Sequence, residues 1–154
     1  MKEYDDKGIL KFEGEYLNGK RNGKGKEYDN YNDKLIFEGE YLKGKRNGKG
    51  KEFNLNGKLI FDGEYINNTK TGKCKEYDYN NGKLLFEGEY FFGHRIKGKE
   101  YINGKLNYEG DYLYNIKWIG KGYDINGNVI YELINGNAIS PLISFFKDVI
   151  EKIK

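Results

Sequence analysis

The side chains that could act as nucleophiles or general bases are few in this 154-residue chain. It has one histidine, His94, one cysteine, Cys74, and two serines, Ser140 and Ser144, both near the C-terminal end. Nucleophilic catalysis needs a nucleophile held beside a base, and these residues offer no such pairing. We therefore expect a protein that is not an enzyme and that carries no cofactor.

Metal chemistry is not expected either. His94 lies in a basic stretch with no second His or Cys near it in the sequence, so we interpret it as a solvated or hydrogen-bonded residue. Cys74 stands where other copies of the same segment have Gly25 and Gly50. A small residue tolerated at a glycine position explains it better than a reactive thiol beside lysines. Paired carboxylates of the kind that glycosidases use recur in every unit opposite lysines, which favours a structural role.

A repeat dominates the sequence. The pentapeptide Phe-Glu-Gly-Glu-Tyr at 12–16 returns, with small changes, at 37–41, 61–65, 86–90 and 108–112, a period of about 24 residues. Such a period is typical of stacked units whose neighbours complete each other's core. We therefore expect a single domain, with an array of about five to six units over residues 1–138 and a C-terminal cap over 139–154.

Each unit predicts a β-hairpin. Apolar residues and glycine alternate with glutamates from Leu10 to Tyr16, so one face of the strand is aromatic and the other acidic. Glycine weakens a strand, and its recurrence at one position indicates that a neighbouring ring lies across the bare backbone. Asn-Gly pairs at 56–57, 81–82, 103–104 and 126–127 favour type I′ turns, and a longer polar loop is expected to lead into the next unit.

The predicted fold is therefore all-β: an elongated, twisted antiparallel sheet of stacked hairpins. Twist would make a trough of the aromatic face, although the sequence leaves open which face is concave. Lysines in the Gly-Lys-Gly-Lys segments at 23–26 and 48–51 are expected opposite the glutamates, which gives an alternating charge ladder on the solvent face. The net charge, with 27 Lys and Arg against 24 Asp and Glu, is only +3, so no nucleic-acid partner is expected.

The unit at 37–50, Phe-Glu-Gly-Glu-Tyr-Leu-Lys-Gly-Lys-Arg-Asn-Gly-Lys-Gly, resembles a MORN repeat, whose pattern is roughly Y-x-G-x-[WY]-x-x-G-x-x-x-G-x-G. The resemblance extends from Lys2 to about Asn137, and the Asn-Gly-Lys-Leu turns also resemble MORN-variant repeats. It implies an elongated hairpin array that serves as a scaffold for protein partners. It also implies possible phospholipid binding and dimer formation.

Departures from this pattern gather toward the C-terminal half. Asn68 and Cys74 replace glycines, and the unit after Tyr90 is one residue short around His94. The following segment, 113–120, holds Trp118 among apolar residues where earlier units have Lys, Arg and Asn. Either this end packs against a cap, or it is shaped for a partner.

A different pattern begins at Ser140-Pro141. Apolar residues then recur with helical spacing, at Leu142, Phe145, Phe146, Val149, Ile150 and Ile153. Ser at the N-cap and Pro at the first helical position favour an amphipathic α-helix. We expect this helix to cap the array near Trp118, with docking of a partner and interfacial membrane binding as alternatives. At the other end the short N-terminal strand shows no cap, so we expect either a homodimer through this edge strand or an edge protected by its charged residues.

The sequence is consistent with two alternative functions. The first is a non-catalytic scaffold for protein–protein interaction, in which the aromatic face binds a protein partner through Tyr16, Tyr41, Tyr65, Tyr90, Tyr112 and Trp118. The alternative role of the tyrosines is core packing, because each hairpin needs a buried face. The second is peripheral membrane binding, in which a basic loop edge contacts anionic phospholipid through Lys20, Arg21, Lys45, Arg46, Lys70, His94 and Arg95. A single cysteine, and neither a secretory signal nor a long apolar span, favour a cytoplasmic location, at most peripheral to a membrane.

Overall fold

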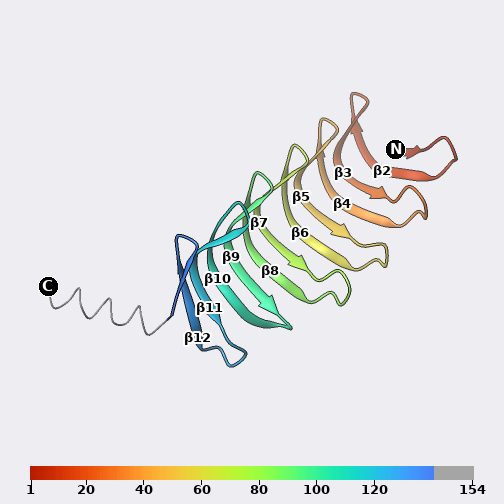
Figure 1. Ribbon diagram of the computed structural model, residues 1–154. Coiled ribbons are helices and arrows are strands. Elements are labelled where there is room, and N and C mark those ends of the chain that lie inside the picture. The colour runs from red at the N-terminus through yellow and green to blue at the C-terminus, as the bar shows by residue number, and fades with distance from the viewer. Residues whose placement is uncertain (141–154) are drawn as a thin grey trace, which may run out of the picture.

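The fold is all-β: one open, twisted antiparallel sheet of thirteen strands, seen in a computed structural model that describes residues 1–140. Each strand pairs only with its neighbours in the sequence, so the sheet is as long as the row of strands (Figure 1). The strands are β1 (Lys2–Tyr4), β2 (Leu10–Leu17), β3 (Lys20–Tyr28), β4 (Leu35–Leu42), β5 (Lys45–Phe53), β6 (Leu59–Ile66), β7 (Thr69–Tyr77), β8 (Leu84–Phe91), β9 (His94–Ile102), β10 (Lys105–Leu113), β11 (Ile116–Tyr123), β12 (Val129–Ile134) and β13 (Asn137–Ile139).

The described residues contain no helix, and hence none long and apolar enough to cross a membrane. The helix expected from the pattern that begins at Ser140-Pro141 lies outside the described residues. Ile139, which the sequence assigned to the cap, belongs to β13.

The turns correct one part of the sequence reading. The segment expected to be a long polar loop, such as 43–50, is instead a two-residue turn followed by strand β5. Its turn residues Lys43 and Gly44 both have positive φ, as a type I′ turn requires. Of the four Asn-Gly pairs expected to form such turns, only Asn103-Gly104 has two positive φ angles. The loop at 54–58 is longer, and the Asn54 side-chain oxygen accepts hydrogen bonds from the backbone N–H groups of Asn56 and Lys58 within it.

Six tight turns therefore lie along one long edge of the sheet, at the upper margin in Figure 1, and we call this margin the turn edge. They connect β2–β3, β4–β5, β6–β7, β8–β9, β10–β11 and β12–β13.

The face that we call the aromatic face carries the core. Phe12, Phe37, Phe61, Phe86 and Tyr108 are completely buried on it, one in every second strand. The glycines of successive strands lie opposite one another beneath these rings, as Gly39 does opposite Gly50. A Cβ on Gly39 would lie 2.8 Å from Cζ of Phe37, which confirms that a ring covers the bare backbone at the predicted position, and a Cβ on the facing Gly50 would lie 2.5 Å from the same atom. The sequence therefore places glycine where a ring must approach the strand.

The opposite face, called the charged face, confirms the expected ladder. Lys26 lies opposite both Glu13 and Glu38, and Lys51 lies opposite both Glu38 and Asp62. The alternation continues across the sheet, through Lys2, Glu13, Lys26, Glu38, Lys51, Asp62, Lys75, Glu87, Lys99, Glu109, Lys121 and Glu132. On this face β3, β5, β7 and β9 carry only lysines in the paired rows, whereas β4, β6, β8 and β10 carry only carboxylates.

Candidate interaction surfaces

The rings of the aromatic face touch one another in an unbroken zigzag. The Tyr41 ring meets Phe12 at 5.1 Å and Phe37 at 5.8 Å between centroids, both edge to face. The same two contacts recur in later units, as far as Tyr112, which meets Phe86 and Tyr108. Edge-to-face contacts between rings stabilise the fold in addition to the stabilisation from apolar burial. A sheet of a single layer therefore obtains a core on one of its faces.

The hydroxyl groups of most of these tyrosines donate hydrogen bonds to glutamates, which are also paired with cations in a network that recurs along the sheet. Tyr41 donates to Glu27 at 2.6 Å, and Arg46 donates two hydrogen bonds to the same carboxylate, at 3.1 Å and 2.6 Å. Tyr90 and Arg95 hold Glu76 in the same way. Burial alone would raise the pKa of Glu27, but the bonds from Arg46 and Tyr41 outweigh it and lower that pKa. The network therefore holds an ionised carboxylate in the core.

The cation of each network also covers a ring. Arg21 lies 4.0 Å above Phe12, and Arg46 lies 3.9 Å above Phe37. Lys70, Arg95 and Lys117 take the same place over Phe61, Phe86 and Tyr108. These guanidinium and ammonium groups replace the second layer that would normally bury the rings.

The structure divides the basic residues proposed for lipid contact. Arg21, Arg46, Lys70 and Arg95 lie inside strands on the aromatic face and are paired with Glu3, Glu27, Glu52 and Glu76. They do not form a loop edge, because the segment that carries them is a strand. Lys20 and Lys45 begin strands beside tight turns and are exposed, as is Lys43 at the tip of one turn.

The tyrosine ladder forms part of the core. Tyr41, Tyr65 and Tyr112 are buried, and Tyr16 and Tyr90 are half-buried against the same cluster. The buried Tyr112 hydroxyl has no hydrogen-bond partner among the described residues, although the corresponding Glu100 is paired with Arg95 and Lys117. A partner that used this face would therefore meet the ionic network rather than open rings.

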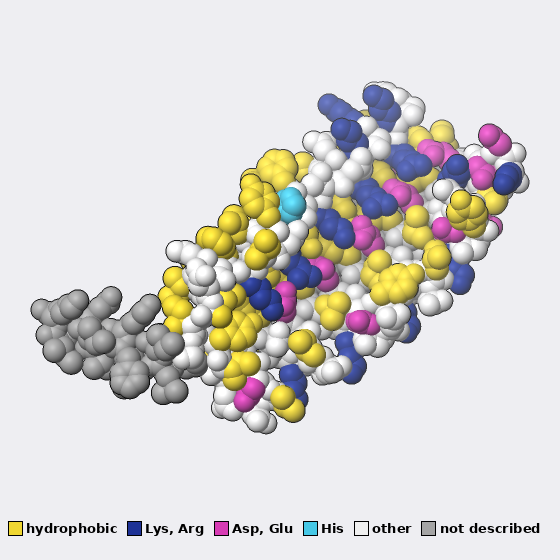
Figure 2. All heavy atoms as spheres, in the orientation of Figure 1, with side chains coloured by type: hydrophobic (Ala, Val, Ile, Leu, Met, Phe, Trp, Pro, Cys, Tyr) yellow, Lys and Arg dark blue, Asp and Glu magenta, His cyan; other side chains and the backbone are white. Residues whose placement is uncertain are grey.

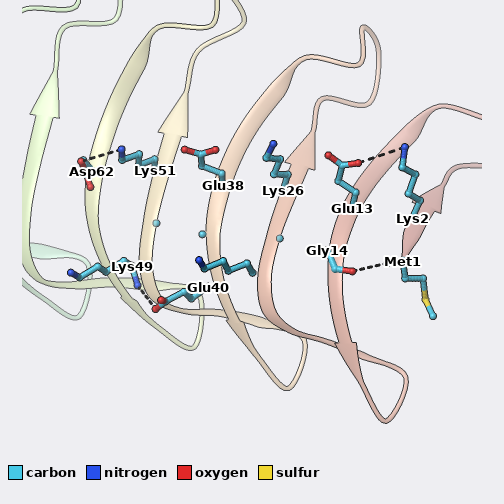
Figure 3. A pocket seen from close by; sticks show the side chains of 14 residues that line it. Met1, Lys2, Glu13, Gly14, Lys26, Glu38, Glu40, Lys49, Lys51 and Asp62 are labelled. Atoms are coloured by element: carbon cyan, nitrogen blue, oxygen red, sulfur yellow. Dashed lines mark hydrogen bonds and ion pairs between the residues drawn. The ribbon is translucent and has the colours of Figure 1, made fainter.

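The charged face bears a groove of about 660 Å³ that crosses β1 to β6 (Figure 3). Its floor is the glycine row, including Gly25 and Gly39, and lysines and carboxylates of alternating sign form both walls. The N-terminal ammonium group closes one end by donating to the Gly14 carbonyl at 2.7 Å. Because neighbouring wall residues have opposite charge, the groove selects for neither anions nor cations.

The turn edge differs in composition between the two halves of the sheet. Lys43 and Asn67 occupy the first position of the two-residue turn in the N-terminal half. Phe92 and Tyr114 occupy it in the next two turns, and both side chains are 72% exposed. Figure 2 shows Lys and Arg side chains gathered at this margin over the first strands, and hydrophobic side chains gathered farther along it toward the C-terminal strands.

Phe92 and Tyr114 are held in an unfavourable backbone conformation. Their φ angles are 47° and 49°, a region that bulky residues rarely adopt, and the other tight turns have Asn or Lys at this position. Side-chain contacts hold the turns around them in place. The ring centroids of His94 and Tyr114 lie 5.4 Å apart, and Oδ1 of Asn115 accepts a 2.7 Å hydrogen bond from the backbone N–H of Arg95. Backbone strain beneath an exposed aromatic side chain points to use of that side chain.

Trp118, the remaining candidate for partner contact, is half-buried in β11. Its ring packs over the last tight turn, where a Cβ on Gly136 would lie 3.1 Å from Cζ3. Cys74 is buried, and burial raises the pKa of its thiol to about 12, so it is not a thiolate at neutral pH. No cluster of three or more His, Cys, Asp or Glu side chains in residues 1–140 could hold a metal ion.

Sequence reasoning missed two sets of residues. The glutamates at 3, 27, 52, 76 and 100 were not distinguished from the solvent-facing ones, although each lies in a recurring Lys-Glu-Tyr or Lys-Glu-Phe segment. Phe92 and Tyr114 were not singled out, although the signal was present as aromatic residues at the turn position where other tight turns have Asn or Lys. Compared with known proteins, the chain matches no family model and no curated protein.

Proposed function

We propose that this protein is a non-catalytic scaffold of the MORN-repeat type that binds a protein partner at the C-terminal half of its turn edge. The exposed aromatic residues Phe92 and Tyr114, on strained backbone at adjacent tight turns, carry this proposal. Exposed aromatic anchors are common hot spots of protein interfaces. A cytoplasmic location and the absence of catalysis remain part of the same proposal.

The closed state of the aromatic face supports the turn edge as the binding surface. The rings of Phe37 and Phe86 are covered by Arg46 and Arg95, which are themselves paired with half-buried carboxylates. A partner would have to break these pairs to reach the rings, at a cost of about 2 kcal/mol each. Phe91 and Phe92, in mutual contact at 4.6 Å between centroids, need no such rearrangement.

Assignment to the MORN-repeat type rests on the unit described above and on the regular hairpins into which it folds. Each unit supplies one Phe, replaced by Tyr108 in the unit at 108–112, one Tyr and one cation to a shared core, and neighbouring units complete it. The proposal includes an amphipathic helix at the C-terminal end of the array, based on the residue pattern from Ser140 onward.

Substitution at the turn tips tests the scaffold function. Phe92→Asn and Tyr114→Asn introduce the residue that other tight turns have at this position, so the fold is retained while the aromatic anchors are lost. Affinity capture from the native source, read by mass spectrometry, should recover partners with the original chain and lose them with the double variant. Lys43→Asn, at the matching position of an N-terminal turn, is the control. Identical partners for all three chains would refute the proposal.

A second function is favoured by the exposed lysines on the same margin. Lys20, Lys43 and Lys45 lie at the first two tight turns, and the aromatic tips follow farther along the edge. Basic residues beside exposed aromatic residues suit an anionic lipid surface, at about 1 kcal/mol for each lysine near it. Sedimentation with phosphatidylserine vesicles at physiological salt tests this function. Charge removal at the three lysines should release the protein, and no binding by the original chain rejects the idea.

We also propose a homodimer through the first edge of the sheet. β1 covers only part of β2, because it pairs with residues from Leu10 to Glu13, and the Met1 carbonyl accepts the Gly14 amide. The stretch of β2 beyond Gly14 has no strand on that side among the described residues. An open strand edge favours pairing with a second copy. Light scattering that shows a monomer at high concentration would refute the dimer.

A further inference from the structure

A separate apolar corner lies on the charged face where the turn edge meets the last strands. It consists of Leu113, Ile116, Ile119 and Ile134, all exposed, with Ile116 67% exposed. Leu113 lies directly opposite Ile116, and Ile119 lies opposite Asp111, so their side chains share the charged face. The corner is distinct from the turn tips used in the proposed function, since Phe92 and Tyr114 occupy the tips themselves.

The corner exists because lysines have been replaced there. Ile116 begins β11 as Lys20 begins β3, and Ile119 precedes the row glycine Gly120 as Lys24 precedes Gly25. Leu113 and Ile134, in contrast, are apolar at a position that is also apolar in earlier units, because β2 and β4 likewise end in leucine. Two changes from lysine to isoleucine therefore join scattered apolar residues into one contiguous area at this end only.

The chain itself supplies a segment that fits this area. β13 ends at Ile139, opposite Glu132, so the chain leaves the sheet beside the corner. The next 14 residues, 141–154, carry apolar side chains with helical spacing, and as a helix they would measure about 21 Å. The corner extends over the three strand spacings from β13 to β10, about 14 Å. A helix that begins at Pro141 can therefore cross the corner without a linker.

We propose that residues 141–154 pack as an amphipathic helix on the corner formed by Leu113, Ile116, Ile119 and Ile134 of the same chain. Attachment at Ser140 keeps the segment at a high effective concentration beside the corner, so a modest apolar contact is sufficient. The aromatic face offers it no comparable place, because Leu133 and Tyr108 are already buried there. The helix covers the last strands and leaves the aromatic turn tips free for a partner.

Disulfide trapping in the purified full chain tests this packing. Ile119→Cys is combined with Val149→Cys in a Cys74→Gly background, which restores the residue that the other units have at position 74. Mild oxidation with diamide should give an intramolecular disulfide, seen as a monomer that has lost two free thiols. The matched control is Lys24→Cys with Val149→Cys, because Lys24 holds the equivalent position at the other end of the sheet. We expect trapping at least about tenfold faster at Ile119.

Each result decides the question. Equal trapping rates for the two pairs would overturn the proposal, and a disulfide-linked dimer would show that the corner receives the segment of a second copy. Phe146→Glu, placed on the apolar side of the segment, should abolish fast trapping while the β-sheet circular dichroism stays unchanged. Moving the second cysteine to Ile150 keeps the test valid if Val149→Cys is poorly oriented. The measurement needs no partner, so failure of the scaffold proposal would not affect it.

Discussion

The hydroxyl of Tyr41 in β4 donates a 2.6 Å hydrogen bond to Oε1 of Glu27 in β3. This bond joins two successive repeats, since Glu27 closes one unit and Tyr41 belongs to the next. Arg46 holds the same carboxylate from β5. The core is therefore a series of junctions between units, and its stability should depend on charge and pH as well as on apolar burial.

Glu27→Gln should destabilise the sheet by about 2 kcal/mol at neutral pH, because Arg46 loses its carboxylate partner in a half-buried site. The pKa of Glu27 is lower in the folded chain than its ordinary value of 4.5. Its contribution is therefore present above about pH 4.5 and is lost as the pH falls through the lowered pKa. Urea unfolding over this range should show a shallower acid loss for the variant. Glu89→Gln, on the charged face, should change little; equal effects of both variants would contradict the network.

Alkaline pH should lower the stability of the fold, because half-buried tyrosines ionise. Burial and hydrogen bonds to Glu13 and Glu87 raise the pKa of Tyr28 and Tyr101 to about 12. The stability that they contribute is complete below about pH 10 and is lost as the pH rises through 12. Near-ultraviolet absorbance of the phenolates should thus rise in two phases in the native chain and in one phase near pH 10 in urea. A single native phase near pH 10 would contradict these contacts.

Gly50→Ala should cost about 1–3 kcal/mol, because the new methyl group would lie 2.5 Å from Cζ of Phe37. Thermal unfolding followed by circular dichroism measures the loss. Cys74→Ala is the matched control, since this row position already accommodates a Cβ opposite Gly63. It should cost less than about 1 kcal/mol. Comparable losses at the two sites would show that ring contact does not select the glycine.

Lys51→Glu should create a run of three carboxylates, because its cross-strand neighbours are Glu38 and Asp62. We expect a loss of about 1 kcal/mol in dilute buffer that shrinks in about 0.5 M NaCl, where exposed charges are screened. Lys51→Gln removes the attraction without adding repulsion and should cost only a few tenths of a kcal/mol. Denaturant unfolding at two salt concentrations separates the cases. A salt-independent loss would indicate a packing defect instead of repulsion.

Phe92→Asn should stabilise the isolated protein by about 1 kcal/mol, because Asn tolerates the positive φ of 47° better than Phe does. Phe91→Asn changes the neighbouring residue, whose φ is not positive, and should give no gain. Thermal midpoints of the two variants provide the comparison. A loss of stability in Phe92→Asn would show that the ring serves the fold, and the case for a binding role would then fail.

Much of the fold could be predicted from the sequence because its signals are local and repeated. Alternation from Leu10 to Tyr16 determined the two faces, and the glycine that recurs inside this strand, as Gly14 and Gly39, indicated close ring contact. The turns were harder to place, because Asn-Gly pairs and Lys-Gly pairs both allow positive φ and only strand pairing decides between them. That error placed Arg46 in a loop, although it lies in a strand above Phe37.

The interaction surfaces were harder to predict for a different reason. Whether Glu27 faces solvent or the core depends on which residue of the neighbouring strand lies opposite it, and Phe12 and Phe37 are 15 and 10 positions away in the sequence. The significance of Phe92 likewise comes from its backbone angle and exposure, which no single residue type specifies. Composition identified the residues, but only the register assigned them to a face.

The alternation of lysine strands with carboxylate strands limits how such a sheet can change in length. A whole repeat adds one strand of each sign, so duplication or loss of a unit leaves the net charge and the pairing pattern of the charged face intact. A single added strand would place like charges side by side and would separate a tyrosine from its glutamate. Copy number can therefore vary over evolution in steps of two strands, with little effect on solubility or on the core.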